Sequence, residues 1–295
     1  MDDLRLVEEA VRAGKHDSNM VSLIESSRPY GLNFSSLYHS IHADQSIGLR
    51  GHDVLELGGA LPAQWVFDHI GVNSWTAIEN EVYEQLIPGG NQYPHTVDNA
   101  RENLVSLYSY HSNGIQDYVD QLNSQFPLAG KNTKMVFDRV YSVAAFEHID
   151  NLAAALDSCS QICQSGALFY SYFTPIWCAP YGHHLGAPEI PNLPPYWHLL
   201  NSPQAAFRYF LRSGYTTCES QAHVNSIYKN THINRLTTYD YDIIISSSPW
   251  EVLHKQPVNY VSVDNMAPEI SATIKVNHPR LSYLCDGYWI VLRLP

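Results

Sequence analysis

Apolar residues in the first two thirds of the chain alternate between two spacings. Short apolar runs bounded by glycine or polar residues predict buried strands at 53–57, 74–78, 104–110, 136–143 and 167–173. Stretches with helical spacing lie between several of them, at 63–69, 117–126 and 152–164. Because a parallel crossover needs such a helix, the alternation predicts an α/β fold with a doubly wound, mostly parallel sheet.

The chain on either side of this region is organised differently. Helices are expected at 4–13 and at about 34–47, ahead of the first strand. Seven prolines between residues 175 and 203 predict a largely irregular stretch. Helices resume at 203–213 and 239–245, and the apolar run 287–294 predicts a strand that rejoins the sheet. We therefore expect an N-terminal helical segment (1–50), an α/β core (51–175), an inserted lid (176–280) and a terminal strand (281–295).

Composition narrows the classes of partner. The 295 residues include 29 acidic and 17 basic side chains, a formal net charge of -12 that disfavours nucleic acid as a substrate. No run of 18 apolar residues predicts a membrane span, and the acidic start Met1-Asp2-Asp3 does not resemble a signal peptide. Five cysteines without a disulfide-like spacing favour a reducing cytoplasm.

A glycine turn follows the first predicted strand, in the segment Glu56-Leu57-Gly58-Gly59-Ala60-Leu61-Pro62. Glycine lets a backbone approach a ligand closely, and the start of the next helix offers free N–H groups. The segment resembles the first motif of class I S-adenosylmethionine-dependent methyltransferases. That resemblance implies that Gly58, Gly59 and Ala60 lie along the amino-acid part of S-adenosyl-L-methionine, and that Glu56 helps to hold its ammonium group. Ala60 and Pro62 replace glycines of many members, and a plain strand-to-helix turn is the alternative.

Two further stretches match the family in order. Glu79, followed by Asn80, ends the second strand with a carboxylate that can accept both ribose hydroxyls. In the loop after the third strand, the resemblance implies that Asp117 contacts the adenine amino group while Ile115 packs on the ring. Asp117 equally suits a capping position at the start of the next helix.

The fourth predicted strand ends in Val143-Ala144-Ala145-Phe146-Glu147-His148. This ending resembles the small-molecule methyltransferase pattern, in which the strand ends beside the reacting methyl group and continues into a Glu-His pair. The resemblance implies a cofactor contact for Ala144 and makes His148 a catalytic candidate. A histidine packed in the core is the alternative for His148.

Aromatic and histidine residues gather in the predicted lid. Trp177, Tyr181, Tyr196 and Trp197 are candidates to enclose a planar acceptor, and His183, His184 and His198 are candidates to accept a proton from it. A proline-rich loop held down by its own rings is the alternative. No metal site is predicted, because adjacent histidines usually point in different directions and the helical two-His spacing is missing.

The sequence therefore predicts an S-adenosylmethionine-dependent methyltransferase that acts on a small aromatic or heterocyclic molecule by in-line transfer to N, O, S or C. A methyltransferase-like fold serving only as a binding or regulatory module is the main alternative. A nicotinamide-dependent oxidoreductase is disfavoured, because Gly-x-Gly-x-x-Gly is missing. The acceptor, the use of a general base and the presence of a homodimer stay open.

Overall fold

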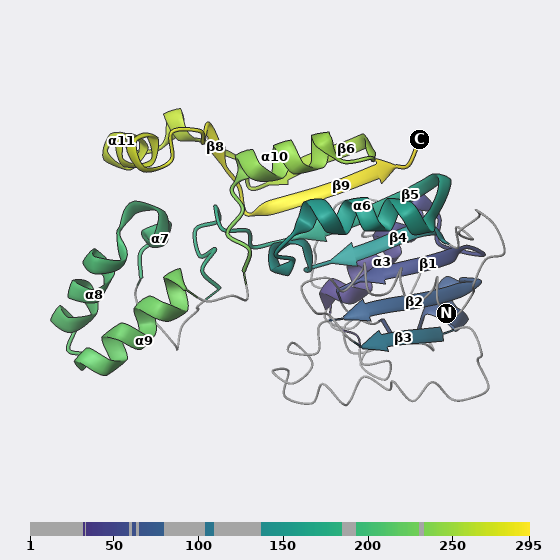
Figure 1. The fold of residues 1–295 in the computed structure, drawn as a ribbon, viewed down its shortest axis with the longest axis horizontal. Helices are drawn as coiled ribbons and strands as arrows, with labels where there is room; N and C mark the ends of the chain where they lie inside the picture. The colour runs from purple at the N-terminus through teal and green to yellow at the C-terminus, as the bar shows by residue number, and fades with distance from the viewer. Residues whose placement is uncertain are drawn as a thin grey trace, which may run out of the picture.

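A computed structural model describes residues 32, 34–58, 61–62, 65–79, 104–108, 137–184, 193–229 and 233–295, with the backbone alone at 34, 78–79 and 104–108. Its main sheet has the order β3-β2-β1-β4-β5-β9-β6 (Figure 1). Five strands run parallel: β1 (Asp53–Leu57), β2 (Ser74–Glu79), β3 (Leu104–Tyr108), β4 (Phe137–Val143) and β5 (Cys163–Phe173). β9 (Gly287–Arg293) is antiparallel to both of its neighbours, β5 and β6 (Glu251–Val258). The predicted doubly wound, mostly parallel sheet is confirmed.

Alternation along the strands divides the core into two layers. Val54 and Tyr141 pack on one face with α3 (Phe34–Ile47) and the π-helix η2 (Trp65–Ile70). Leu55 and Val140 point to the opposite face, which α6 (Leu152–Ile162) and α10 (Thr238–Ser247) cover. Both faces are therefore apolar, as a sheet with helices on each side requires.

The helix after β1 differs in type from the predicted one at 63–69. The carbonyl of Pro62 accepts from the N–H groups of Trp65 and Val66, and the N–H of Gly71 reaches five residues back to the carbonyl of Val66. This wider turn brings Trp65 and Ile70, five residues apart, into the same buried layer. The periodicity of the sequence predicts a helix here, but packing selects the wider form.

The segment expected as a lid contains several helices, most of them after the proline-rich stretch 175–203. Beyond the carboxyl ends of the strands, Figure 1 shows a group of helices: α7 (Trp197–Leu200), α8 (Pro203–Arg212), α9 (Thr217–Tyr228) and α11 (Pro268–Asn277). A short hairpin pairs β7 (Val261–Ser262) with β8 (Tyr283–Leu284), and the 3-10 turn η5 (Val263–Asn265) lies between them in sequence. The range 176–280 also includes β6, an edge strand of the main sheet. The segment expected as a lid therefore contributes one strand to that sheet.

Sequence periodicity does not predict β6 because the strand has no buried apolar face. Most of its residues are exposed, and it contains Pro257, which cannot donate a ladder hydrogen bond. An edge position tolerates both features, since one side of the strand has no partner within the described sheet.

The order of strands reverses on the two sides of β1, which pairs with β2 on one side and β4 on the other. In open α/β sheets, ligands bind outside the carboxyl ends of the strands at such a switch point. Gly58, Ala144 and Thr174 follow β1, β4 and β5 and therefore lie along this edge. The 3-10 turn η4 (Phe146–His148) extends the edge beyond β4.

Candidate functional site

Glu56 ties the turn after β1 to the next strand. Its carboxylate is buried, and Oε2 accepts hydrogen bonds from the N–H of Leu61 at 2.9 Å and from Nε1 of Trp75 at 2.7 Å. Leu61 lies on the far side of the glycine turn, so the acid fixes both ends of the loop that the resemblance assigns to the cofactor. This structural role was not expected from the sequence.

Gly58 is required at its position by backbone angle and by space. Its φ is +74°, and a Cβ placed on it would lie 2.2 Å from Cβ of Ala145. The turn after β1 therefore touches the chain that follows β4. Ser142 adds a second link, because its Oγ donates to the carbonyl of Leu57 at 3.0 Å. Of the other residues expected in this turn, Gly59 and Ala60 lie outside the described residues.

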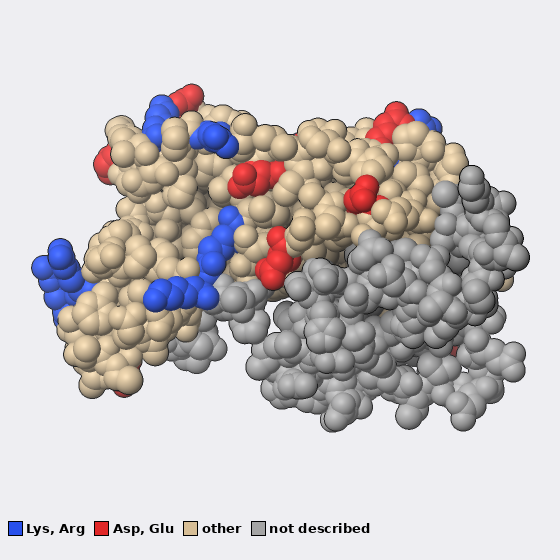
Figure 2. All heavy atoms as spheres, in the orientation of Figure 1, with Lys and Arg blue, Asp and Glu red and all other residues tan. Residues whose placement is uncertain are grey.

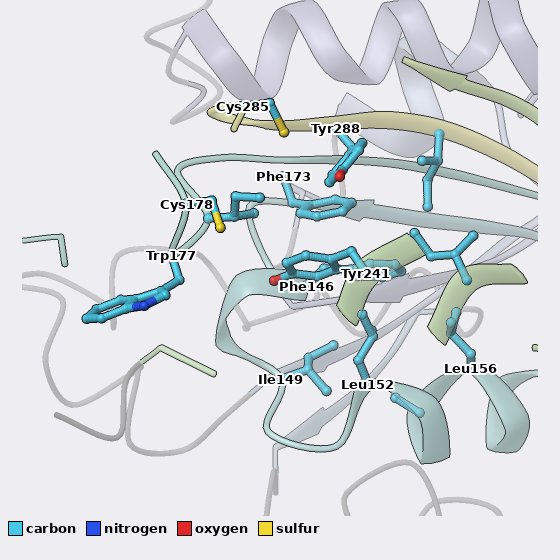
Figure 3. Close-up of a cluster of buried hydrophobic side chains, with 14 of the residues drawn as sticks. Phe146, Ile149, Leu152, Leu156, Phe173, Trp177, Cys178, Tyr241, Cys285 and Tyr288 are labelled. Carbon is cyan, nitrogen blue, oxygen red and sulfur yellow. The ribbon is translucent and has the colours of Figure 1, made fainter. Parts of the chain in front are cut away.

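The ends of β4 and β5 are joined next to this contact. Ala144 is exposed and has a φ of +53°, and its N–H donates to the carbonyl of Tyr172 at 2.8 Å. Behind the edge, the rings of Phe146, Tyr241 and Tyr288 each pack at a tilt against Phe173, in the apolar layer shown in Figure 3. A closely packed layer therefore backs the edge where Ala144 is presented.

Glu147 is fully buried at the same strand end. Its Oε2 has no hydrogen-bond partner among the described residues, while the backbone N–H groups of Glu147 and Thr174 bond the carboxyl group. Burial raises the pKa of Glu147 to about 8 against these two bonds. The side chain is therefore an uncharged acid at neutral pH.

Asn234 holds this strand end against the segment before α10. Its Nδ2 donates to the carbonyls of Phe146 at 2.6 Å and Ile149 at 3.0 Å, and its N–H donates to the carbonyl of Glu147 at 2.9 Å. Tyr241 donates to its Oδ1 at 3.2 Å. One asparagine thus satisfies two carbonyls of the 3-10 turn and that of Ile149 directly after it, where regular pairing has stopped.

The four candidate histidines form two ring contacts. His148 and His184 lie 5.2 Å apart, as do His183 and His198, each pair edge to face. His184 donates from Nε2 to the carbonyl of Pro175 at 2.5 Å, and His198 donates from Nε2 to the carbonyl of Trp177 at 2.6 Å. The structure therefore brings the four candidate histidines into two pairs. In each pair, one ring also donates a hydrogen bond to a backbone carbonyl.

Burial keeps the lid histidines neutral. It lowers the pKa of His183 to about 4 and that of His198 to about 3, and it also lowers the pKa of His184. Such groups are weak bases in the resting protein. A general-base role for His183 or His198 would need the environment of the ring to change when an acceptor binds.

The four aromatic candidates separate into different surroundings. Trp177 is buried, with its ring 4.4 Å from that of His198. Tyr181 is 50% exposed and meets His183 edge to face at 6.3 Å. Tyr196 is half-buried, and Trp197 instead packs on Tyr209 of α8 at 4.7 Å. Trp177 and Tyr181 thus border the histidines, whereas Trp197 anchors the lid helices.

Arg235 was not expected from the sequence, because an arginine in a short polar stretch carries no motif. Its guanidinium lies over the ring of Trp177, with Cζ 5.6 Å from the ring centroid. The backbone of Arg235 has a φ of +54°, directly after the Asn234 clamp. A cation is therefore held beside the aromatic and histidine cluster.

The remaining cofactor candidates cannot be placed in the same way. Asn80, Ile115 and Asp117 lie outside the described residues, and for Glu79 the structure describes the backbone alone. That backbone ends β2, one residue beyond the pairing of Ile78 with Leu57. The position matches the expected edge of the sheet, while the contacts of the Glu79 side chain stay a prediction.

The described residues at the switch point fit S-adenosyl-L-methionine. Gly58 leaves no side chain over the turn, the exposed Ala144 borders it, and Glu56 places a carboxylate at the end of β1.

Among the residues that the structure describes, no group of three His, Cys, Asp or Glu side chains converges as a metal site. The helices of the described chain include none that is long and apolar enough to cross a membrane.

Comparison with known proteins gives likeness in structure without likeness in sequence. No protein-family model and no curated protein matches the chain. An S-adenosylmethionine-dependent methyltransferase from Mesorhizobium loti is similar, with 13% identity, a TM-score of 0.42, and coverage of 83% of this chain and 92% of that one. Geranyl diphosphate methyltransferase in complex with SAM has 8% identity, a TM-score of 0.45, and coverage of 95% and 92%. The cyclase SpnF has 9% identity, a TM-score of 0.43, and coverage of 88% and 81%.

Proposed function

We propose that the protein is an S-adenosylmethionine-dependent methyltransferase acting on a small aromatic or heterocyclic molecule. The observation that carries the proposal is the contact between Gly58 and Ala145 at the switch point of the sheet. It brings the glycine turn of the first motif and the strand end of the fourth motif, 87 positions apart in sequence (145 − 58), to one place. Those two motifs carry the resemblance to the methyltransferase family.

When bound, S-adenosyl-L-methionine would supply an activated methyl group for in-line displacement by a nucleophilic N, O, S or C atom. The protein then has to position the acceptor and keep water away from it. Trp177 and Tyr181 provide aromatic surface beside the histidines, and α7, α8, α9 and α11 lie beyond the carboxyl ends of the strands (Figure 1). Because burial lowers the pKa of His183 and His198 and makes both rings weak bases, acceptors that are already nucleophilic at neutral pH suit this site best.

Calorimetric titration with S-adenosylmethionine and S-adenosylhomocysteine tests the proposal. We expect saturable binding of both, because the turn and the strand ends are already packed in the described structure. No binding at millimolar concentration would refute the proposed function. Binding of both molecules without release of S-adenosylhomocysteine from any acceptor in a chemically diverse panel would instead support the binding-module alternative.

A Gly51→Ala variant is a suitable control for this titration. Gly51 has the same φ as Gly58, +74°, but a Cβ placed on it would meet nothing within 4 Å. It therefore tests the strain of a side chain at positive φ without disturbing the switch point. Gly51→Ala is expected to keep its affinity for the cofactor, and Gly58→Ala is expected to lose it.

A further inference from the structure

Asp286 is a half-buried acid held at the point where the sheet meets the lid. It directly precedes β9, and its carbonyl accepts from the N–H of Ile176 at 2.8 Å and from Oγ1 of Thr174 at 3.1 Å, just beyond the end of β5. Its own N–H donates to the carbonyl of Val258 at 2.8 Å. These three bonds fix the backbone of Asp286 at the carboxyl edge of β5, next to the candidate site.

The carboxylate of Asp286 has one oxygen bonded and one open. Nδ2 of Asn259 donates to Oδ2 at 2.6 Å, and no described residue bonds Oδ1. The Lys and Arg ion pairs within the described residues are Lys255–Asp242, Lys275–Asp264 and Arg293–Glu251. Asp286 is in none of them, and the guanidinium of Arg235 lies over Trp177 instead. A fixed carboxylate with an open oxygen is suited to bind a cation from solution.

Tyr172 of β5 supplies an aromatic face close to this carboxylate. Burial and then the charge of Asp286 raise the pKa of Tyr172, and the same two causes, in the same order, raise the pKa of Tyr196 in the lid. The carboxylate therefore lies near both phenols. The ring of Tyr172 is half-buried and stacks on His39 with 3.9 Å between centroids, while its carbonyl accepts from the N–H of the exposed Ala144. A ring held in this way can attract a cation to its other face.

The groups around Tyr172 do not oppose a cation at neutral pH. Burial, and then the charge of His42, lowers the pKa of His39 to about 3, so the stacked imidazole is neutral. Burial raises the pKa of Glu147 to about 8, and its ionisation above that pH adds negative charge. The chain as a whole has a net charge of -12, and Figure 2 shows Asp and Glu side chains spread between the lid helices and the sheet. Such a protein attracts small cations and repels small anions.

We propose that Asp286 and the ring of Tyr172 form a subsite for an ammonium group, so that the acceptor is an aromatic or heterocyclic molecule that carries an amine. Asp286 supplies charge, Tyr172 supplies an aromatic face, and Tyr196 borders the carboxylate from the lid. A protonated amine has no lone pair, so the methylated atom is another nucleophile of the same molecule. The role as methyl acceptor rests on the proposed function, but the ammonium subsite itself does not.

Benzylamine and benzyl alcohol are the probes, because they share shape and differ in charge at pH 7. Ligand-observed NMR on the full chain, without cofactor, gives the affinity of each at millimolar concentration. We expect benzylamine to bind more tightly than benzyl alcohol. Asp286→Asn should weaken benzylamine binding by roughly tenfold, the loss expected for a charge-assisted hydrogen bond, and leave benzyl alcohol unchanged. The asparagine can still accept from Asn259, so the bond that holds the side chain is kept.

Two variants of Tyr172 test the aromatic face separately. Tyr172→Leu should weaken benzylamine binding by roughly threefold, because the ring is lost, whereas Tyr172→Phe should keep the affinity. Asp157→Asn is the matched control for the carboxylate, since Asp157 is exposed on α6 and also accepts from one amide, Nε2 of Gln161 at 3.2 Å. It should leave both affinities unchanged. Circular dichroism identifies the folded variants, and Tyr172→Leu decides the matter if Asp286→Asn is unfolded.

Three results would each overturn the inference. They are equal binding of the two probes to the unaltered protein, no benzylamine binding at all, and full benzylamine binding by a folded Asp286→Asn or Tyr172→Leu variant. S-adenosylmethionine is itself a cation, so its affinity for Asp286→Asn is also measured. A loss as large as that for benzylamine would assign the carboxylate to the cofactor and overturn the assignment to the acceptor.

The cofactor titration separates this inference from the proposed function. If S-adenosylmethionine binds to the unaltered protein and benzylamine does not, only the ammonium subsite is wrong. If benzylamine binding depends on Asp286 and the cofactor does not bind, the methyltransferase proposal fails and the ammonium subsite stands. The two proposals therefore fail through different measurements.

Discussion

The α-carbon of Gly58 packs so closely against Ala145 that a Cβ on the glycine would lie 2.2 Å from the Cβ of its neighbour. This distance is shorter than any contact between two carbon atoms that are not bonded to each other. The ends of β1 and β4 can therefore approach this closely only because Gly58 has no side chain. The contact lies at the switch point of the sheet, and it can be tested with single methyl groups.

Gly58→Ala is expected to destabilise the protein by more than Gly51→Ala does. Both variants carry the strain of alanine at positive φ, about 1 kcal/mol. Gly58→Ala adds overpacking against Ala145, about 1–3 kcal/mol more. The double variant Gly58→Ala/Ala145→Gly should recover most of the second part. Urea unfolding of the four proteins measures these differences, and a double variant no more stable than Gly58→Ala would show that the contact is not the cause.

Asn234→Ala is expected to destabilise the protein by about 1–3 kcal/mol, because the carbonyls of Phe146 and Ile149 lose their donor. Asn234→Asp should destabilise it further, since a carboxylate places an acceptor against the same two carbonyls. Asn225→Ala on α9 is the control, because Asn225 is exposed and the described hydrogen bond of its side chain joins it to Gln221 of the same helix. Thermal unfolding gives the ranking, and equal effects at Asn234 and Asn225 would contradict the clamp.

The sequence predicts the strands and their order along the chain because the buried positions of the central strands are mostly apolar. It also places Glu56, Gly58 and Ala144 at one edge, since parallel strands end together. The sequence does not predict β6, whose residues are mostly exposed, or the clamp at Asn234, which acts through carbonyl groups that every residue carries. Arg235 stays hidden for a different reason: its partner Trp177 is 58 positions away in sequence (235 − 177).

Two of the three α-helices missed in the lid, α9 and α11, have local signals that an apolar pattern does not weigh. α9 begins with a capping box, in which the Thr216 side chain accepts from the N–H of Glu219 and the Glu219 carboxylate accepts from the N–H of Thr216. α11 begins with Pro268 at its first turn. Few residues of either helix are buried, so their apolar spacing is weak. Capping, rather than periodicity, is the sequence feature that could have found α9.

Glu79→Ala is expected to weaken the binding of S-adenosylmethionine, because the ribose hydroxyls lose their acceptor. The end of β2 puts the backbone of Glu79 at the edge where Gly58 follows β1. Calorimetry should show a loss of about tenfold or more, as for a hydrogen-bonded charged group. Asp53→Asn at the opposite end of β1 is the control and should keep the affinity. An unchanged affinity in Glu79→Ala would show that the carboxylate does not contact the cofactor.

Glu147 makes stability fall as the pH rises. The pKa of this buried acid is raised from 4.5 to about 8, so the unfolded chain releases its proton at a lower pH than the folded protein does. Between about pH 4.5 and pH 8 the folded state binds more protons, and its stability therefore decreases across that window. Glu147→Gln removes the titration, and its stability should depend less on pH in this range. Urea midpoints from pH 5 to about pH 9 measure the slope, and equal slopes for both proteins would contradict the buried neutral acid.

The lid histidines have the opposite effect in acid. Burial lowers the pKa of His183 to about 4 and that of His198 to about 3, while the unfolded chain binds a proton at about 6.5. Their contribution to stability is therefore present above pH 6.5 and is lost as the pH falls toward the folded pKa values. The lowered pKa values also affect the expected pH dependence of catalysis. Because these rings stay neutral down to about pH 4, a plot of turnover rate against pH should show no inflection near pH 6.5 from them.

His198→Gln separates the structural role of the ring from its titration. Glutamine can donate to the carbonyl of Trp177, as Nε2 of His198 does at 2.6 Å, but it takes up no proton. The variant should lose less stability than the unaltered protein between about pH 6 and pH 4, and both should show the same slope above pH 7. Turnover in the variant should fall more than cofactor affinity, because the ring packs on Trp177 rather than on the β1 turn. Matching acid slopes in the two proteins would mean that His198 takes up its proton in the folded state, and His198 would then return as a candidate general base.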